Sequence, residues 1–548
     1  MKKVFPYTII FIVNIFFPFN SYSQWTTDVS INTPVCTATD DQIENRIMED
    51  GTGGAFIVWR DYRNGAPDIF VQRLNKDGIA LWTLNGVGAC TYSADQSTPS
   101  IVSDLHGGCI IAWSDWRSSI ERDLYAQRID SNGNMLWTLD GVVVTNKPER
   151  EHSERMCSDG AGGAIVAWEQ QSNVDFSWGV WCQRIDSNGV NVWPSGGMPV
   201  CNATGQRRNE RIQGDGKGGA FITFQDFRNG NDYDIYAQHV SAIGQRLWGN
   251  NAIAICTAPG VQNDPKIDPE PSIGGCFVVW IDKRNGTDYD IYAQKIDSMG
   301  ICQWANNGVP VVTAQGSQTA QDFCSNGGVP GFMVTWKDSR GSNYDIYAQL
   351  IGRDGTPKWN TNGIPVCNAL DDQLNPNIVP DGSGGGIIVW QDSRGNNWDI
   401  AAQRIDSLGN ELWTNNGVQV SVAPSNQTAP KHCSDGNGGT IVCFQDTRNA
   451  GIDIYAQHIF ANGSPNSINL VNKGCDLKIY PNPFSDFISV QNSYMFSHYT
   501  MTDITGKIIF EGNEIGSTDF STIPSGIYFL EITIATSQLK KVVKLIKE

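Results

Sequence analysis

DIYAQKIDS (residues 290–298) is a short, mostly apolar stretch with the composition of a β-strand. Near-copies recur along the chain: DIFVQRLNK (68–76), DLYAQRIDS (123–131), DIYAQHVSA (234–242), DIYAQLIGR (345–353), DIAAQRIDS (399–407) and DIYAQHIFA (453–461). A strand that occurs once in every repeat indicates a fold built from copies of one supersecondary unit.

A second motif, Trp-x-Asp-x-Arg, defines the length of the repeat unit. The residues aligned with its first position are Trp59, Trp113, Trp168, Phe224, Trp280, Trp336, Trp390 and Phe444, and successive ones lie 54 to 56 residues apart. Each unit divides into four short strands with Gly-, Asn- and Asp-rich turns between them. The second strand, as in GAFIVWRD (54–61), is a near-continuous apolar run that we expect to be buried on both faces. Four antiparallel strands per unit predict the blade of a β-propeller.

The two ends of the repeat region predict a closed ring. A tryptophan follows the third strand in seven of the eight units: Trp82, Trp137, Trp193, Trp248, Trp304, Trp359 and Trp413. The last unit ends at IFANGSPNS (459–467) without one, and the missing residue is found at the other end, as Trp25 in QWTTDVSINTPVC (24–36). This exchange requires that the first and last units touch, which removes the exposed edges of an open array. The fold expected is all-β: an eight-bladed β-propeller over residues 24–462, closed by an N-terminal strand.

The N-terminus has the pattern of a secretory signal peptide. Lys2 and Lys3 precede an apolar run to Phe19, and the stretch Ser21-Tyr22-Ser23 favours cleavage after Ser23. No later segment is apolar enough to span a bilayer, so residues 1–23 are expected to be removed and no transmembrane segment to remain.

The composition changes after a linker at residues 463–474. Alternating apolar residues, as in YFLEITI (528–534), predict a small C-terminal β-sandwich over residues 475–548. Ordered short motifs run through this segment: Tyr480, Pro481, Asn482, Pro483, then Gly506, Lys507, then Gly526, Tyr528, and a closing KKVVK (540–544).

These motifs resemble the type A C-terminal sorting domain of the type IX secretion system. The resemblance implies that the secretion machinery is a partner of the chain. It also implies a location outside a Gram-negative cell, either extracellular or on the outer-membrane surface.

The repeat units resemble those of sialidase-like propellers, which carry a turn and a tryptophan between the third and fourth strands. In DSNGNMLW (130–137) the spacing from Asp130 to Trp137 is longer than that of the family's Asp-box. The resemblance therefore implies the architecture and not sialidase activity.

Charge and cysteine usage narrow the possible partners. The formal net charge of −18 argues against a nucleic-acid partner, because phosphate binding depends on clustered Lys and Arg. Most of the 14 cysteines occupy equivalent positions of successive units, too far apart to bond to each other, and are interpreted as small buried side chains. Cys433 and Cys443, on adjacent strands, are the best candidate disulfide pair.

The repeated Asp and Arg of the second motif are interpreted as framework, because seven copies on one ring cannot all form a catalytic centre. Six histidines show no metal-ligand spacing, and we expect no metal site and no cofactor.

Candidate binding residues lie where the repeat changes. The third unit lacks the Asp-x-Arg pair and carries Glu169 and Trp178 instead. An early position of the first strand is basic in five of eight units, at Arg46, Arg155, Arg211, Lys266 and Lys431. A basic rim around the central channel of an acidic protein favours an anionic ligand such as an acidic glycan.

Two functions follow from these observations. The first is a secreted or surface-attached propeller that binds or adheres to a glycan or a surface protein. The alternative is an extracellular glycoside hydrolase or lyase that draws its acid and base from Glu149, Glu151, His152, Glu154, Glu169 and Glu210.

Overall fold

The computed structural model describes residues 25–118, 121–325, 331–465, 479–490, 496–534 and 540–548. The chain divides into two compact units, Met1–Asn466 and Ser467–Glu548. The segment predicted as a signal peptide lies outside the described residues.

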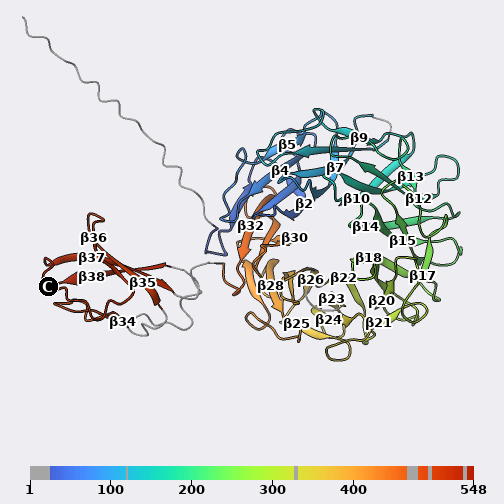
Figure 1. Cartoon of the computed structure of the whole chain (residues 1–548). Coiled ribbons are helices and arrows are strands. Elements are labelled where there is room, and N and C mark those ends of the chain that lie inside the picture. The colour runs from blue at the N-terminus through green and yellow to red at the C-terminus, as the bar shows by residue number, and fades with distance from the viewer. Residues whose placement is uncertain (1–24, 119–120, 326–330, 466–478, 491–495, 535–539) are drawn as a thin grey trace, which may run out of the picture. The chain divides into compact units, whose positions relative to one another are not determined.

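The first unit contains eight four-stranded antiparallel sheets within its described residues. Each sheet has an inner strand, and these strands surround the centre in Figure 1: β2 (Gln42–Glu49), β6 (Gln96–Ser103), β10 (Arg150–Ser158), β14 (Arg207–Gly214), β18 (Gln262–Glu270), β22 (Gln318–Ser325), β26 (Gln373–Pro380) and β30 (Gln427–Ser434). The second strands are β3 (Ala55–Asp61), β7 (Cys109–Asp115), β11 (Ala164–Gln171), β15 (Ala220–Asp226), β19 (Gly275–Asp282), β23 (Gly331–Asp338), β27 (Gly386–Asp392) and β31 (Thr440–Asp446).

The third strands carry the repeated stretch quoted above: β4 (Asp68–Leu74), β8 (Asp123–Ile129), β12 (Trp178–Ile185), β16 (Asp234–Val240), β20 (Asp290–Ile296), β24 (Asp345–Gly352), β28 (Asp399–Ile405) and β32 (Asp453–Ile459). The outer strands are β1 (Thr33–Cys36), β5 (Val87–Cys90), β9 (Val142–Thr145), β13 (Met198–Pro199), β17 (Ile253–Cys256), β21 (Val309–Val312), β25 (Ile364–Cys367) and β29 (Val418–Ser421). No helix occurs in the described part of the chain, so the all-β prediction of four-stranded antiparallel sheets is confirmed.

The core of the first unit lies between neighbouring sheets. The second strands are buried on both faces, as in β7, where every residue is buried. One cluster joins Val58 and Val71 of one sheet to Ile111 and Trp113 of the next, and similar clusters recur along the unit. Because each sheet buries both of its faces against neighbours, no single sheet is expected to be stable alone.

The turn tryptophans connect each sheet to the next one. The indole Nε1 of Trp82 donates to the carbonyl oxygen of Ser131 at 3.1 Å, in the turn after the third strand of the following sheet. Its ring also fills the space over Gly133, where a Cβ would lie 3.1 Å from the ring. Equivalent indole bonds are donated by Trp137, Trp193, Trp248, Trp304, Trp359 and Trp413.

The N-terminal strand lies in the sheet of the last three strands. The strand order is β1-β32-β31-β30, and Thr33 is paired with Ala456. Trp25 donates its indole hydrogen to the carbonyl oxygen of Lys76 at 2.8 Å, which is the same bond that the other turn tryptophans make. β2 also contacts β30 and β31, so the first and last sheets are neighbours.

The repeated Asp and Arg have the contacts expected of a framework. The Arg63 guanidinium holds both oxygens of Asp61 and donates to the carbonyl oxygen of Asn85 at 2.9 Å. It also stacks 3.9 Å from the centre of the Phe70 ring. Ion pairs of the same kind join the Asp and Arg of six other sheets.

The best candidate disulfide is wrong. All thirteen cysteines of the described residues are free. Cys433 lies opposite Ile441, and Cys443 lies opposite Lys431, so the antiparallel register does not bring the two sulfurs together. Instead, Cys443 Sγ accepts a hydrogen bond from the Asn45 amide at 3.1 Å.

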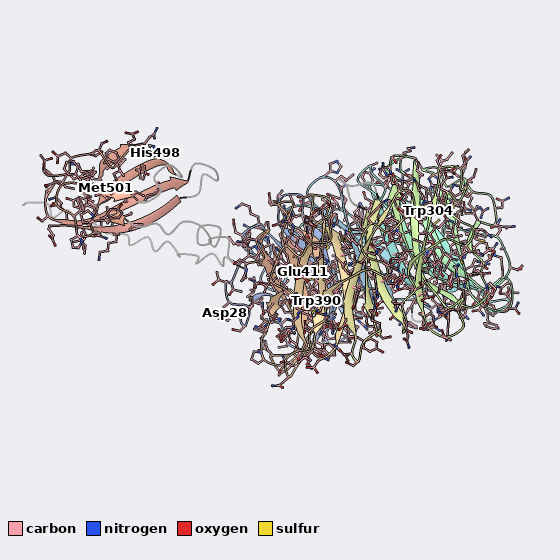
Figure 2. All side chains as sticks on the ribbon, turned by 90° about the horizontal axis from the view of Figure 1, so that it is seen from below. Asp28, Trp304, Trp390, Glu411, His498 and Met501 are labelled. Atoms are coloured by element: carbon pink, nitrogen blue, oxygen red, sulfur yellow. The ribbon has the colours of Figure 1, made fainter. Side chains whose placement is uncertain are left out.

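The second unit is a small β-structure with its own core. Its main sheet has the order β36-β35-β37-β38, formed by β35 (Phe496–Asp503), β36 (Ile508–Gly512), β37 (Gly526–Ile534) and β38 (Lys540–Lys547). A two-stranded sheet pairs β33 (Ile479–Tyr480) with β34 (Ser489–Val490). Met501, labelled in Figure 2, is fully buried in this core with Leu530 and Ile532. Asn482 accepts from the amide of Ile546 at 2.9 Å and donates to the carbonyl of Lys544, which ties this part of the predicted sorting motif to β38.

We predict that Trp25→Ala destabilises the first unit by about 3–5 kcal/mol, because it removes a buried indole and its inter-sheet hydrogen bond. Trp82→Ala, which loses the same contact between two other sheets, serves as the comparison, and Leu84→Ala at an exposed site of the same turn is the neutral control. Thermal and urea denaturation measure the difference. If Trp25→Ala behaves like Leu84→Ala while Trp82→Ala is destabilising, the N-terminal segment does not hold the last sheet.

Candidate functional site

A bulge in each of the eight inner strands fixes the candidate site. In β2, Glu44 and Asn45 lie opposite one residue of β3, and the register shift ends at Arg46. The first bulge residue has a positive φ in every inner strand, from 44° to 65°: Glu44, Thr98, Ser153, Asn209, Asp264, Ala320, Asn375 and Ala429. Such a conformation is costly for residues other than glycine, so its repetition marks a constraint of the fold.

The residue after the bulge occupies one register position in all eight strands. The set is Arg46, Ser100, Arg155, Arg211, Lys266, Asp322, Asn377 and Lys431, and each of these residues is half-buried. The five basic members, Arg46, Arg155, Arg211, Lys266 and Lys431, are called the cationic ring below. The alignment by sequence therefore predicted the register of these residues.

Carboxylates compensate the cationic ring only in part. Arg211 pairs with Asp264 at 3.1 Å. Lys431 Nζ donates to the Asn377 amide oxygen at 2.9 Å, and Arg46 and Arg155 donate to the backbone carbonyls of Asn45 and Glu154.

Burial and mutual repulsion act on the same cations. Burial lowers the pKa of Arg46 and of Arg211, and in both cases the nearby charge of Arg155 lowers it further. The pKa of Lys431 falls to about 8 through burial and the charge of Arg46. Burial and Arg211 lower the pKa of Lys266 in the same way. These cations therefore destabilise one another, and an anion placed among them would relieve that cost.

Glu169 and Trp178 belong to a second cluster. The Glu169 carboxylate accepts from Arg208 Nε at 2.9 Å and from the Asn209 backbone amide at 2.7 Å, and it lies 3.6 Å from His152 Nε2. Arg208 stacks 4.4 Å from the Trp178 ring centre, and the His152 ring meets the Trp178 ring edge-on at 4.6 Å. Trp178 is only 8% exposed, so it does not present an open face to a sugar.

The other carboxylates considered for catalysis are held separately. Glu151 accepts from the Thr145 hydroxyl at 2.7 Å, and Glu154 accepts from the hydroxyls of Thr98 and Ser114. Burial raises the pKa of Glu151 to about 8 and that of Glu154 to about 7. Glu210 is buried with both carboxyl oxygens unpartnered among the described residues, and burial together with Glu169 raises its pKa well above the ordinary value.

Sequence reasoning missed a pocket of about 370 Å³ at the edge of the third sheet. Its lining includes Glu149, Gln170, Gly179, Trp181 and Arg207. The alignment contained a signal for it, because Gly179 replaces the Asp that begins the other third strands and Arg207 replaces a Gln that begins six of the inner strands.

Two searches of the described residues gave no result. Among them, no group of three or more His, Cys, Asp or Glu side chains is arranged to hold a metal ion. No helix that is long and apolar enough to cross a membrane occurs in that part of the chain.

Residues 478–548 match the family described as the secretion system C-terminal sorting domain. The sequence-based recognition of this domain is confirmed, and the chain is exported through the type IX secretion system to the cell surface or the extracellular space. No curated protein matches the chain.

Solved structures resemble the chain only remotely. A puromycin hydrolase is 11% identical with a TM-score of 0.41, and the match covers 77% of this chain and 61% of that protein's length. PorZ of Porphyromonas gingivalis, a surface component of the type IX secretion system, is 12% identical over 94% of this chain and 82% of its own, with a TM-score of 0.26. The Hadza microbial sialidase Hz136 is 9% identical over 71% and 73%, with a TM-score of 0.34. These values do not bear on function.

We predict that Glu151→Gln stabilises the protein at pH 8. The folded-state pKa of Glu151 lies above its ordinary value of 4.5, so stability falls as pH rises from about 4.5 to about 8, by roughly 1.4 kcal/mol for each pKa unit. A glutamine, which the aligned position carries in β2 and β6, has no proton to lose. Gln96→Glu in β6 is the reciprocal variant and should lose stability over the same pH range. Melting curves at pH 5 and pH 8 test this, and a variant–wild-type difference that does not change with pH would contradict it.

We predict that removing residues 475–548 leaves the protein in the periplasm, because the export signal is lost with the sorting domain. Fractionation of the native host, probed for the first unit, measures this. Full-length Leu84→Ala is the control for a change that leaves export intact. Normal appearance of the truncated chain in the medium or on the surface would refute the prediction.

Proposed function

We propose that the first unit is an eight-bladed β-propeller, closed by β1, that binds an anionic ligand at the cationic ring. The domain plan is a signal peptide at 1–23, the propeller at 24–462, a linker at 463–474 and the sorting domain at 475–548. The protein would act as a secreted or surface-attached binding or adhesion module, and an acidic glycan is the ligand class that best fits its charge.

The bond from Trp25 to Lys76 supports closure. It repeats the contact made between the other neighbouring sheets, and it joins the N-terminal segment to the first sheet while β1 pairs with β32. A ring joined in this way has no free sheet edge between its first and last blades.

The observation that carries the binding proposal is the uneven charge of the ring position. Five of the eight residues are cations and one, Asp322, is an acid, in a chain with a net charge of −18. Half-buried cations that lower each other's pKa are destabilising unless a counter-charge is present. A positive centre within a negative body also focuses the field on an approaching anion.

The contacts of the carboxylates favour binding over hydrolysis. Glu154 and Glu169 are engaged by protein donors, and Glu210 is buried against Glu169. A glycosidase needs two carboxyl groups facing each other across an open cleft. A hydrolysis assay on acidic glycans, run beside the binding assay, decides between the two functions.

The test of the binding proposal is the double variant Arg155→Ala/Arg211→Ala. The affinity for sulfated or uronate glycans on an array should fall by about 1.5–3 kcal/mol for each charge-assisted hydrogen bond lost. Raised salt should weaken wild-type binding as well. Folding should be nearly unchanged, because repulsion within the ring is relieved.

Arg340→Ala/Arg394→Ala is the matched control, since it also removes two arginines but takes them from framework ion pairs. This control should lose stability and keep its affinity per folded molecule. Undiminished binding by the Arg155/Arg211 variant, or equal binding of neutral glycans, would overturn the proposal.

A further inference from the structure

The pocket of the third sheet lies where the repeat loses its ion-paired hairpin. It is lined by the 172–177 hairpin, by Gly179 and Trp181 of β12, by residues 199–203 and by Arg207 at the start of β14. Its volume of about 370 Å³ falls within the range of about 300–1,000 Å³ typical of small-molecule sites.

The other seven sheets carry a buried aspartate at the position of Gly179. These residues are Asp68, Asp123, Asp234, Asp290, Asp345, Asp399 and Asp453. In β11 and β12 the equivalent pair is Gln170 opposite Gly179, where β3 and β4 have Asp61 opposite Asp68. The third sheet has therefore lost both carboxylates at this point.

An arginine faces the space from which the aspartate is missing. A Cβ on Gly179 would lie 3.6 Å from Arg207 Nη2 and 3.4 Å from Trp181 Nε1. Glycine is not required here by the backbone, because the φ of Gly179 is outside the left-handed region. A side chain at residue 179 would thus extend into the pocket toward the guanidinium.

Arg207 lacks a counter-charge. It is 8% exposed, and its side-chain hydrogen bond in the described part of the chain goes from Nη1 to the carbonyl oxygen of Ala203. No ion pair joins Arg207 to a described carboxylate, and Nε has no partner among the same residues. A buried guanidinium without an acid is costly, and the Nε–Nη2 edge is the one that binds a carboxylate through two hydrogen bonds.

We propose that this pocket binds a uronic acid residue, whose carboxylate takes the place of the missing aspartate on Arg207. The sugar class is favoured by the rest of the lining, which combines the amides of Gln170, Asn173 and Asn202 with the partly buried Trp181 ring. Amides donate to and accept from hydroxyls, and an indole packs against the apolar face of a sugar. Lys147 Nζ lies 3.7 Å from the Trp181 ring centre and holds the ring in position.

The test is calorimetric titration of the full exported protein with glucuronate, glucose and acetate. Glucuronate should bind at least about tenfold more tightly than either of the others, because only glucuronate supplies both the carboxylate and the hydroxyls. Arg207→Gln and Gly179→Asp should each weaken glucuronate binding by roughly 10- to 100-fold, the first by removing the cation and the second by supplying an internal carboxylate to it.

Both variants restore a residue that other sheets carry, so folding is expected to persist and is checked by melting curves. Arg150→Gln removes an exposed arginine near the same sheet and should bind glucuronate like the wild type. Binding of glucose or acetate as tight as that of glucuronate, tighter binding of a short peptide through its C-terminal carboxylate, or unchanged affinity in Arg207→Gln would overturn the assignment. The pocket is separate from the cationic ring, so this titration and the glycan-array test fail or succeed independently.

Discussion

The first unit depends on a hydrogen bond between a tryptophan of one sheet and a turn carbonyl of the next. The indole ring covers a glycine of that turn, where a Cβ would collide with it or press closely against it, and the N–H group is satisfied by the carbonyl oxygen. Burial of the ring and satisfaction of its one polar group thus occur in a single contact. Trp25 makes this contact from the opposite end of the sequence, and for that reason the N-terminal segment belongs to the last sheet.

The repetition of that contact allows individual sheets to vary without loss of the architecture. The inner strands keep their bulge whether the residue that follows the left-handed position is Asn45, Glu154 or Gln321. Asn45 and Gln321 donate across to a backbone carbonyl at the neighbouring bulge, and Glu154 accepts from Thr98. The third sheet lacks the Asp–Arg pair but keeps Trp137 and Trp193 in place, so its upper hairpin is free to differ. Functional change is therefore expected at the hairpins and at the ring position, and not at the turn tryptophans.

Periodicity was sufficient to predict the strands, the role of Trp25 and the register of the cationic ring, because these follow from one alignment of the repeats. The environment of single side chains did not follow from it. Trp178 was expected to be open, and its burial depends on Arg208 and His152, which come from two different inner strands. Cys433 and Cys443 lie on adjacent strands, and only the bulge-shifted register shows that Lys431 and not Cys433 lies opposite Cys443. Arg207 was visible in the sequence as a substitution for glutamine, but its missing counter-charge required the position of Gly179 across the pocket.

Closure of the ring by the N-terminal strand is most directly tested by hydrogen exchange of the backbone amides in the unmodified exported protein. The peptide that contains β1 should exchange as slowly as the one that contains β5, because both are outer strands paired along a third strand. Exchange of the β1 amides at the rate of an unpaired chain, with β5 protected, would contradict the account.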